Sequence, residues 1–176
     1  MEQPNCEEVH TTDWRHDEAR FPLYTLHTSL AIRWWLTHLA HANEAKRFVD
    51  DKLATGRVGV VAVEGTDLQI LNELSSDLGQ FRLSPTIAVD LFNDVSKVFE
   101  QMAERGILRT VNSKPLAFPA FVIACLYNIS LWDALAVALA AQTGCPLLVA
   151  DEELHQVLRV IQADRPAFQV AWLPDI

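Results

Sequence analysis

The sequence predicts an α/β protein in which helices cover both faces of a central, mostly parallel sheet. Two observations carry this prediction: the expected strands are short continuous apolar runs, and helical segments separate them. Strands buried on both faces are typical of parallel sheets. The 176 residues, half of them apolar, suffice for one domain with a substantial core. We therefore expect a single domain at residues 21–176, after a polar tail at residues 1–20 without apolar periodicity.

Two strands and four helices are expected in the first half of the domain. Serine and asparagine are good helix N-caps, proline is tolerated at the first helical position, and glycine ends helices. The expected elements are a strand at 23–26, an apolar helix from there to Leu39, a helix capped by Asn43 and ended by Gly56, a strand at 58–63, a helix at 65–78, and a helix from Ser84-Pro85 to about Arg105.

The second half repeats the alternation of strands and helices. Gly106 ends the last helix of the first half and Gly144 ends the helix at 130–143, because glycine is the usual residue after a helix C-terminus. The expected elements are a strand at 107–111, helices at 116–127 and 130–143, a strand at 147–150, a helix at 151–161, and a last, edge strand at 169–173.

The formal charge of −9 argues against nonspecific nucleic-acid binding, which needs clustered Lys and Arg. Basic residues are instead scattered among acids, so RNA is a disfavoured partner. The chain has no apolar run of eighteen residues, and its first residues are polar and acidic, so we expect a cytoplasmic protein without a membrane segment. Three cysteines without C-x-x-C spacing suggest neither a disulfide framework nor a zinc site.

Candidate functional residues follow the expected strands, because ligands of open α/β sheets gather beyond the carboxyl ends of strands. His27, Glu64 and Asp151 hold such positions, and Asp133 lies in the first turn of an apolar helix. Both aspartates also have a simpler reading as helix caps. Asp133 stands three residues after Ser130, which is capping-box spacing, and Asp151 precedes an acidic helix start.

Two linked motifs resemble the C-terminal signature of PIN-domain proteins, with the bacterial VapC-type toxins as the nearest relatives. They are Ser130-Leu131-Trp132-Asp133-Ala134-Leu135 with the alanine-rich helix that follows, and Val149-Ala150-Asp151 with Glu152 and Glu153. The resemblance extends over about residues 23–174 and implies a three-layer PIN-like fold. His27 stands where the family has its first aspartate, and Gln69 stands where it has a glutamate.

The resemblance implies a ribonuclease that holds Mg²⁺ or Mn²⁺ between three or four carboxylates. Here His27 and Gln69 replace two of them, while Asp133 and Asp151 are retained. The loss of two negative charges should weaken metal affinity and the activation of a metal-bound water. The leading hypothesis is therefore a PIN-like domain with a degraded nuclease site, catalytically weak or inactive, which acts as a binding or regulatory module or is the remnant of a toxin.

The alternative is a metal-dependent endoribonuclease with a rearranged metal site made of Asp133, Asp151 and His27. Imidazole suits Mn²⁺, Fe²⁺, Ni²⁺ or Zn²⁺ better than Mg²⁺. Ser29 would hydrogen-bond a water or phosphate in such a site, or else cap the helix that follows it. Glu64 and Asp67 are considered as substitute acids, but Asp67 should face a different side of its helix from Gln69.

Two protein partners are expected. One is a second copy of the chain, docked through Trp34, Trp35 and the helix that carries them, because tryptophan is enriched at interfaces. The other, implied by the resemblance alone, is a small antitoxin-like protein.

Overall fold

The computed structural model describes residues 21–79 and 84–176, so the predicted tail at residues 1–20 lies outside the described residues. Five strands form one sheet in the order β3-β2-β1-β4-β5, and every pairing in it is parallel. The predicted α/β class is confirmed, with a sheet that is entirely parallel. The strands are β1 Leu23–Leu26, β2 Gly59–Val63, β3 Leu108–Val111, β4 Leu147–Val149 and the edge strand β5 Val170–Trp172.

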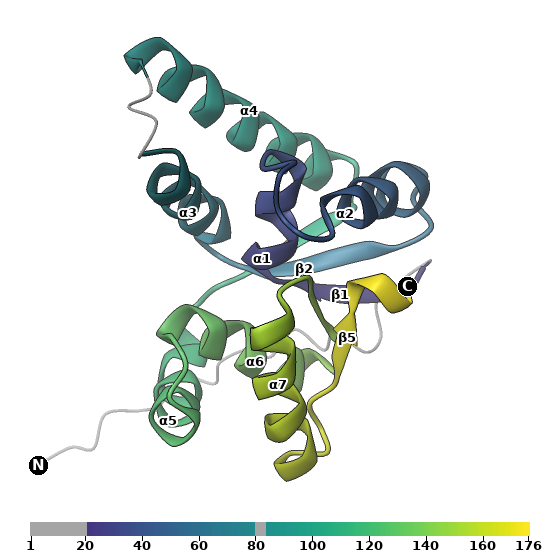
Figure 1. The fold of residues 1–176 in the computed structure, drawn as a ribbon. Coiled ribbons are helices and arrows are strands. Elements are labelled where there is room, and N and C mark those ends of the chain that lie inside the picture. The colour runs from purple at the N-terminus through teal and green to yellow at the C-terminus, as the bar shows by residue number, and fades with distance from the viewer. Residues whose placement is uncertain (1–20, 80–83) are drawn as a thin grey trace, which may run out of the picture.

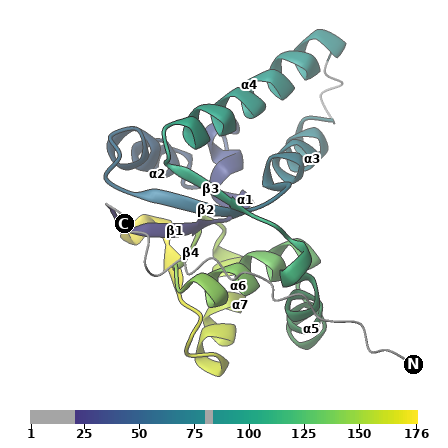
Figure 2. The ribbon, with the colours of Figure 1, turned by 180° about the vertical axis from the view of Figure 1, so that it is seen from behind.

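Helices cover both faces of the sheet, which gives three layers (Figures 1 and 2). One face carries α1 Thr28–Ala31, α2 Ala42–Phe48, α3 Thr66–Gly79 and α4 Pro85–Glu104, and the other carries α5 Ala117–Tyr127, α6 Leu131–Thr143 and α7 Glu152–Asp164. Four shorter helical segments complete the fold: η1 Ile32–Trp34, η2 Val49–Leu53, η3 Lys114–Leu116 and, after β5, η4 Leu173–Asp175.

The chain changes direction across the sheet next to its first strand. It runs outward from β1 through β2 to β3, then crosses back and adds β4 and β5 on the other side of β1. Such a switch point leaves a crevice at the carboxyl ends of the two strands that flank it, here β1 and β4. The residues that follow these strands are therefore placed to form a site.

The two layers of helices enclose two separate hydrophobic clusters. Along β2, Val60 and Ala62 point into one cluster while Val61 and Val63 point into the other, and all four are buried. Successive side chains of a strand point to opposite faces, so a strand covered on both sides must be apolar throughout. Helix α6 is buried from Ala134 to Ala140, as its unbroken apolar sequence predicts.

The helix expected to reach Leu39 is shorter than predicted. Only α1 and η1 are helical, and η1 ends at Trp34. The side chain of Arg33 explains the break, since it is buried and donates from Nε to the carbonyl oxygen of Ala40 at 2.6 Å. This bond stabilises the turn that the chain makes after η1.

Asn43 does not cap the second helix, so that prediction was wrong. The N-cap of α2 lies two residues earlier, at His41, which has a left-handed backbone (φ 63°) and makes no side-chain cap bond. The His41 ring instead packs edge-on against Trp172, with ring centroids 5.1 Å apart. The predicted stop at Gly56 is confirmed, because this glycine has a φ of +68° after the π-helical segment η2.

Trp34 and Trp35, the predicted dimer contacts, are partly buried and pack against the first hydrophobic cluster. Their ring centroids lie 5.7 Å apart. In the described part of the chain, no single helix is long and apolar enough to cross a membrane. Lys114–Tyr127 and Leu131–Thr143 reach that length only as a pair, which is bent by 118°.

Candidate functional site

A cleft of about 350 Å³ opens at the switch point, beyond the ends of β1 and β4. It brings together four of the five predicted catalytic residues, namely His27, Ser29, Asp133 and Asp151. The remaining lining residues are Thr28, Ile32, Arg33, Leu39, Glu73 and Leu154.

His27 and Asp133 make the central contact of the cleft. His27 follows β1 directly and is 5% exposed, and its Nε2 lies 3.0 Å from Oδ1 of Asp133. Its other ring nitrogen, Nδ1, accepts a hydrogen bond from the backbone N–H of Ser29 at 3.0 Å. Because Nδ1 accepts, the proton of a neutral imidazole sits on Nε2 and is donated to Asp133. Both ring nitrogens are thus engaged.

Asp133 also bonds to the cap of its own helix. Ser130 caps α6, accepting from the backbone N–H of Asp133 at 3.1 Å, and its hydroxyl donates to Oδ2 of Asp133 at 2.8 Å. The predicted cap is confirmed. In a capping box the acid would accept from the backbone N–H of the cap residue, whereas here Asp133 accepts from the Ser130 hydroxyl. Burial alone would raise the pKa of Asp133, but the hydrogen bonds from His27 and Ser130 outweigh it and hold the pKa below its ordinary value.

Asp151 caps α7, as predicted. Its Oδ1 accepts from the backbone N–H of Leu154 at 2.8 Å, and Glu152 and Glu153 follow in the first turn, where the helix dipole favours acids. Asp151 remains partly exposed and lines the cleft. It therefore caps its helix and faces the site at once.

Ser29 does not cap the helix after β1, so that alternative was wrong. The N-cap of α1 is His27, whose imidazole accepts the N–H of Ser29. The hydroxyl of Ser29 instead accepts from the backbone N–H of Ala150 at 3.2 Å. This bond ties the end of β1 to the end of β4 across the switch point.

Glu73, which sequence reasoning missed, supplies the third carboxylate of the cleft. Its Oε1 accepts from Thr28 Oγ1 and from Gln69 Nε2, each at 3.0 Å. Gln69 lines a small neighbouring cavity together with His27 and Trp132. Glu73 lies four residues after Gln69 and therefore on the same side of α3, and this spacing was the signal that could have identified it.

Arg33 was also missed, although a lone charge in an apolar stretch was visible at its position. It is 6% exposed, and its guanidinium donates to the carbonyl oxygens of Ser29 and Ala40. Burial lowers the pKa of Arg33, while the negative charges of Asp151 and Glu73 act in the opposite direction. A guanidinium thus lines the same cleft as the three carboxylates.

The other acids considered from the sequence do not line the cleft. Glu64 is exposed after β2, and Asp67 is partly exposed in the first turn of α3.

The donor atoms around the cleft are poorly arranged for a metal ion. Within residues 21–79 and 84–176, no three His, Cys, Asp or Glu side chains are grouped so that they could hold one. His27 would have to give up its bond to Asp133 or to the Ser29 N–H to offer a lone pair to a metal. Metal ligation by Asp133, Asp151 and His27 stays a prediction.

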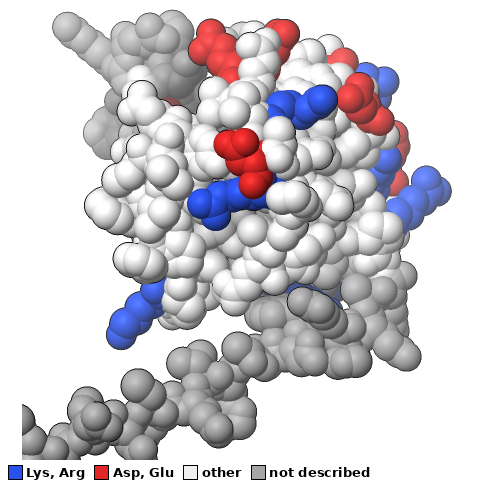
Figure 3. Space-filling model, turned by 90° about the horizontal axis from the view of Figure 1, so that it is seen from below, with Lys and Arg blue, Asp and Glu red and all other residues white. Residues whose placement is uncertain are grey.

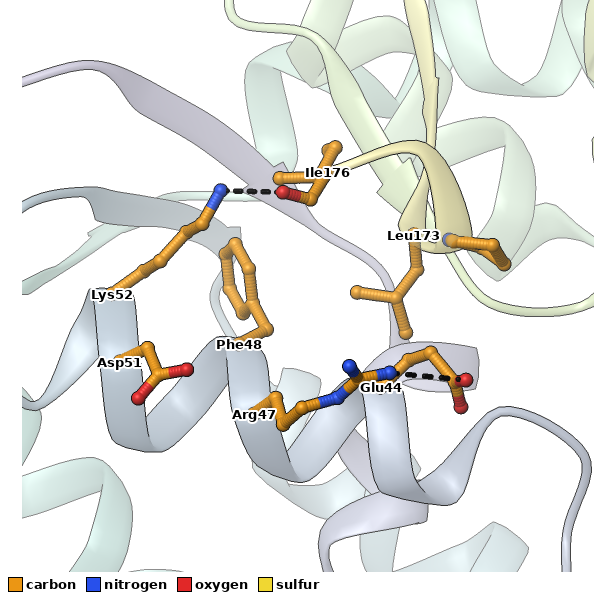
Figure 4. Close-up of a pocket in the computed structure, with 8 residues that line it drawn as sticks. Glu44, Arg47, Phe48, Asp51, Lys52, Leu173 and Ile176 are labelled. Carbon is orange, nitrogen blue, oxygen red and sulfur yellow. Dashed lines mark hydrogen bonds and ion pairs between the residues drawn. The ribbon is translucent and has the colours of Figure 1, made fainter.

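A second cavity, of about 200 Å³, lies between α2, η2 and the C-terminal segment (Figure 4). Lys52 Nζ donates there to the backbone oxygen of Ile176 at 2.7 Å, and Arg47 pairs with Glu44 at 3.3 Å. None of the predicted site residues lines this cavity.

Fold and site together define an α/β protein with an all-parallel five-strand sheet and an acidic, hydrogen-bonded cleft at its switch point. No protein-family model matches the chain, and no curated protein matches it either.

Proposed function

We propose that the chain is a PIN-like domain in which hydrogen bonds and an internal guanidinium replace the metal centre of a nuclease. On this proposal it acts as a binding or regulatory module, or is the remnant of a toxin, and has little or no ribonuclease activity. The observation that carries the proposal is the bond between His27 Nε2 and Asp133 Oδ1, at 3.0 Å, with the opposite ring nitrogen occupied by Ser29.

The first support is that His27 gives the Asp133 carboxylate a hydrogen-bond donor, so that no metal ion is needed there. In the family that the motifs resemble, this corner of the site holds a second carboxylate, and two neighbouring carboxylates need a positive charge between them. An imidazole N–H donor removes that need, because it offers a hydrogen bond where the other residue would add a negative charge.

The second support is the position of Arg33. Its buried guanidinium lines the same cleft as Asp151 and Glu73, and their negative charges act on it. Arginine remains protonated under all ordinary conditions, so it supplies a permanent positive charge of its own. The acids that would gather around a divalent ion are thus partly neutralised from within the protein.

The third support concerns the substrate. Three carboxylates and one guanidinium line the cleft, which leaves an excess of negative formal charge. The whole chain carries −9 as well. A phosphodiester backbone would be repelled unless metal ions screened it, which favours a protein partner over RNA.

A sensitive RNA-cleavage assay with Mg²⁺ and with Mn²⁺ tests the proposal. The purified chain should show no turnover above that of Asp133→Asn, which keeps the side-chain volume and loses the charge. Robust turnover that disappears in Asp133→Asn would overturn the proposal.

The alternative function is a metal-dependent endoribonuclease with a rearranged site. It is favoured by one observation, namely that Glu73, Asp133 and Asp151 line the same cleft, with the pKa of Asp133 held low so that it is ionised at neutral pH. The same assay separates the two functions. Under the alternative, activity with Mn²⁺ is abolished by Asp133→Asn and by Asp151→Asn, whereas Glu64→Gln, outside the cleft, leaves it unchanged.

A further inference from the structure

A mostly apolar cavity of about 200 Å³ lies on the face of the sheet that carries α4 (Figure 1). It is enclosed by η1, η2, the last turns of α4 and the segment that leads into β3. Its apolar walls include Val49, Leu53, Val98, Met102 and Ile107. The cavity shares no lining residue with the cleft at the switch point. It is therefore a separate candidate for a binding site.

Trp34, which lines this cavity, has an unsatisfied polar atom. Its indole Nε1 is buried and has no hydrogen-bond partner among the described residues. Nearly all buried polar groups of folded proteins are hydrogen-bonded, so this atom calls for an explanation. Met102 lines the same cavity, and its unbranched, flexible side chain can move aside to admit a partner. The indole N–H is thus suited to an oxygen acceptor that enters the cavity.

Arg105 brings a second donor to the cavity. It is the C-cap of α4, and its Nη2 donates to the carbonyl oxygen of Ala54 at 2.7 Å. This bond holds the guanidinium beside η2. Within the described part of the chain, its other N–H groups make no hydrogen bond. They remain available to a carboxylate, whose two oxygens match the fork of a guanidinium.

The charge at the cavity is positive, in a chain with a formal net charge of −9. Among the lining residues that the structure describes, Arg105 is charged and none is Asp or Glu. On the opposite layer of helices, α5–α7, Figure 3 shows Lys and Arg interspersed with Asp and Glu. The last carbonyl oxygens of α4 are also occupied, because the backbone N–H groups of residues 105–107 bond to them. An anionic ligand therefore meets a guanidinium without a competing acid in the lining.

We infer that this cavity binds a small carboxylate with an apolar body. The apolar walls take the body, Arg105 takes the carboxylate, and the Trp34 N–H is a further donor to its oxygens. An ammonium ligand would meet the guanidinium with no acid to offset it, and a hydrocarbon would leave the indole N–H unpaired. The inference concerns a site apart from the cleft and holds whether or not the cleft is catalytic.

The volume of the cavity limits the size of the ligand. An engineered apolar cavity of about 150 Å³ in another protein holds one benzene molecule. About 200 Å³ therefore accommodates a single ring or a short alkyl chain together with its carboxylate. Aromatic rings also pack favourably against tryptophan. Phenylacetate is accordingly the probe, with phenylacetamide as its neutral analogue and phenethylamine as a cation of similar size.

Titration of the full chain with each probe at neutral pH, followed by heteronuclear NMR, tests the inference. Phenylacetate should bind saturably with a dissociation constant of about 1 mM or lower, as expected for a ligand of about ten non-hydrogen atoms. Phenylacetamide should bind about tenfold more weakly, because it lacks the charge. Phenethylamine should not bind. The absence of saturable phenylacetate binding overturns the inference, as does equal binding of phenethylamine.

Variants of the lining locate the site. Arg105→Gln should raise the dissociation constant for phenylacetate about tenfold, whereas Arg105→Lys keeps the charge and should lose less. Val98→Trp fills the cavity and should abolish binding. The matched control is Arg57→Gln, since Arg57 is exposed and lies outside the lining. A Val98→Trp protein that binds like the wild type overturns the inference, as does an equal loss of affinity in Arg57→Gln and Arg105→Gln.

A measurement on the wild type covers the case in which a variant does not fold. The indole N–H resonance of Trp34, assigned by its loss in Trp34→Phe or by sequential connectivity, should move downfield on saturation with phenylacetate, because the N–H gains an acceptor. The resonance of Trp172, which lies outside the lining, should not move. Saturable binding that leaves the Trp34 resonance in place contradicts the inference.

Discussion

Nε2 of His27 lies 3.0 Å from Oδ1 of Asp133, although 106 residues separate them in the chain. The first residue after β1 is thereby joined to the first turn of α6. The bond joins the two layers of helices at the carboxyl end of the central strand.

Loss of the imidazole should destabilise the fold. His27→Phe keeps a ring of similar size but leaves the Ser29 N–H and the Asp133 carboxylate without their partner. We expect the free energy of unfolding in urea at pH 7 to fall by about 1–3 kcal/mol, the usual cost of unpaired buried polar groups. His155→Phe is the control, because His155 stacks on the Trp172 ring and that stacking survives the change. An equal effect of both substitutions would contradict the role given to His27.

The contribution of Asp133 should depend on pH in one direction. Its folded-state pKa lies below the ordinary value of 3.8, so ionised Asp133 stabilises the fold at neutral pH. This stabilisation is lost as the pH falls through the folded pKa, because both states then bind the proton. The stability difference between wild type and Asp133→Asn should therefore be largest near neutral pH and shrink below about pH 4. A difference that grows on acidification would contradict the assignment.

A glutamate at position 69, where the PIN-domain motif has one, should destabilise this chain. In Gln69→Glu, a carboxylate replaces the amide that donates to Glu73 Oε1 at 3.0 Å, so two acids would meet. We expect a loss of thermal stability at pH 7 that adding Glu73→Gln recovers, because the amide is then on the other partner. Additive effects of the two substitutions in a double-mutant cycle would show that the pair does not interact.

A side chain at position 59 should destabilise the fold. A Cβ there would lie 2.5 Å from the ring carbon Cε2 of Phe21 and 2.8 Å from Cδ2 of Leu23, where β1 and β2 pair. Gly59→Ala should lower the unfolding free energy by about 1–3 kcal/mol through overpacking. Trimming the ring in Phe21→Ala should make the glycine substitution less costly. Chemical denaturation of the wild type, the two single variants and the double variant measures this coupling. Fully additive losses of unfolding free energy would argue against the contact.

Most elements were predictable from the sequence because their ends are marked locally. Ser84 and Ser130 cap helices where the sequence places them, and Gly56 ends one. The break after Trp34 was not predictable, since it depends on the Arg33 side chain reaching Ala40. No local pattern specifies a bond between a side chain and a carbonyl seven residues later.

The sequence predicted which residues line the site better than it predicted the hydrogen bonds between them. The predicted residues converge because each follows a central strand or begins a helix next to it. His27 and Ser29 follow β1, Asp151 follows β4, and Asp133 lies in the first turn of α6. Glu73 and Arg33 were not predicted, because their place in the cleft depends on how α3 and η1 pack against α1. The tautomer of His27 depends on the fold of α1, which presents the Ser29 N–H to Nδ1.

Calorimetric titration with Mn²⁺ tests the central claim most directly. The wild type should show no saturable binding at neutral pH. The Asp133 carboxylate is hydrogen-bonded to His27, and the positive charge of Arg33 offsets the negative charges of Asp151 and Glu73. His27→Asp should bind one Mn²⁺, since it places a carboxylate at the end of β1 and frees Asp133 from its bond to the imidazole. Tight one-to-one binding by the wild type that Asp133→Asn abolishes would contradict the account.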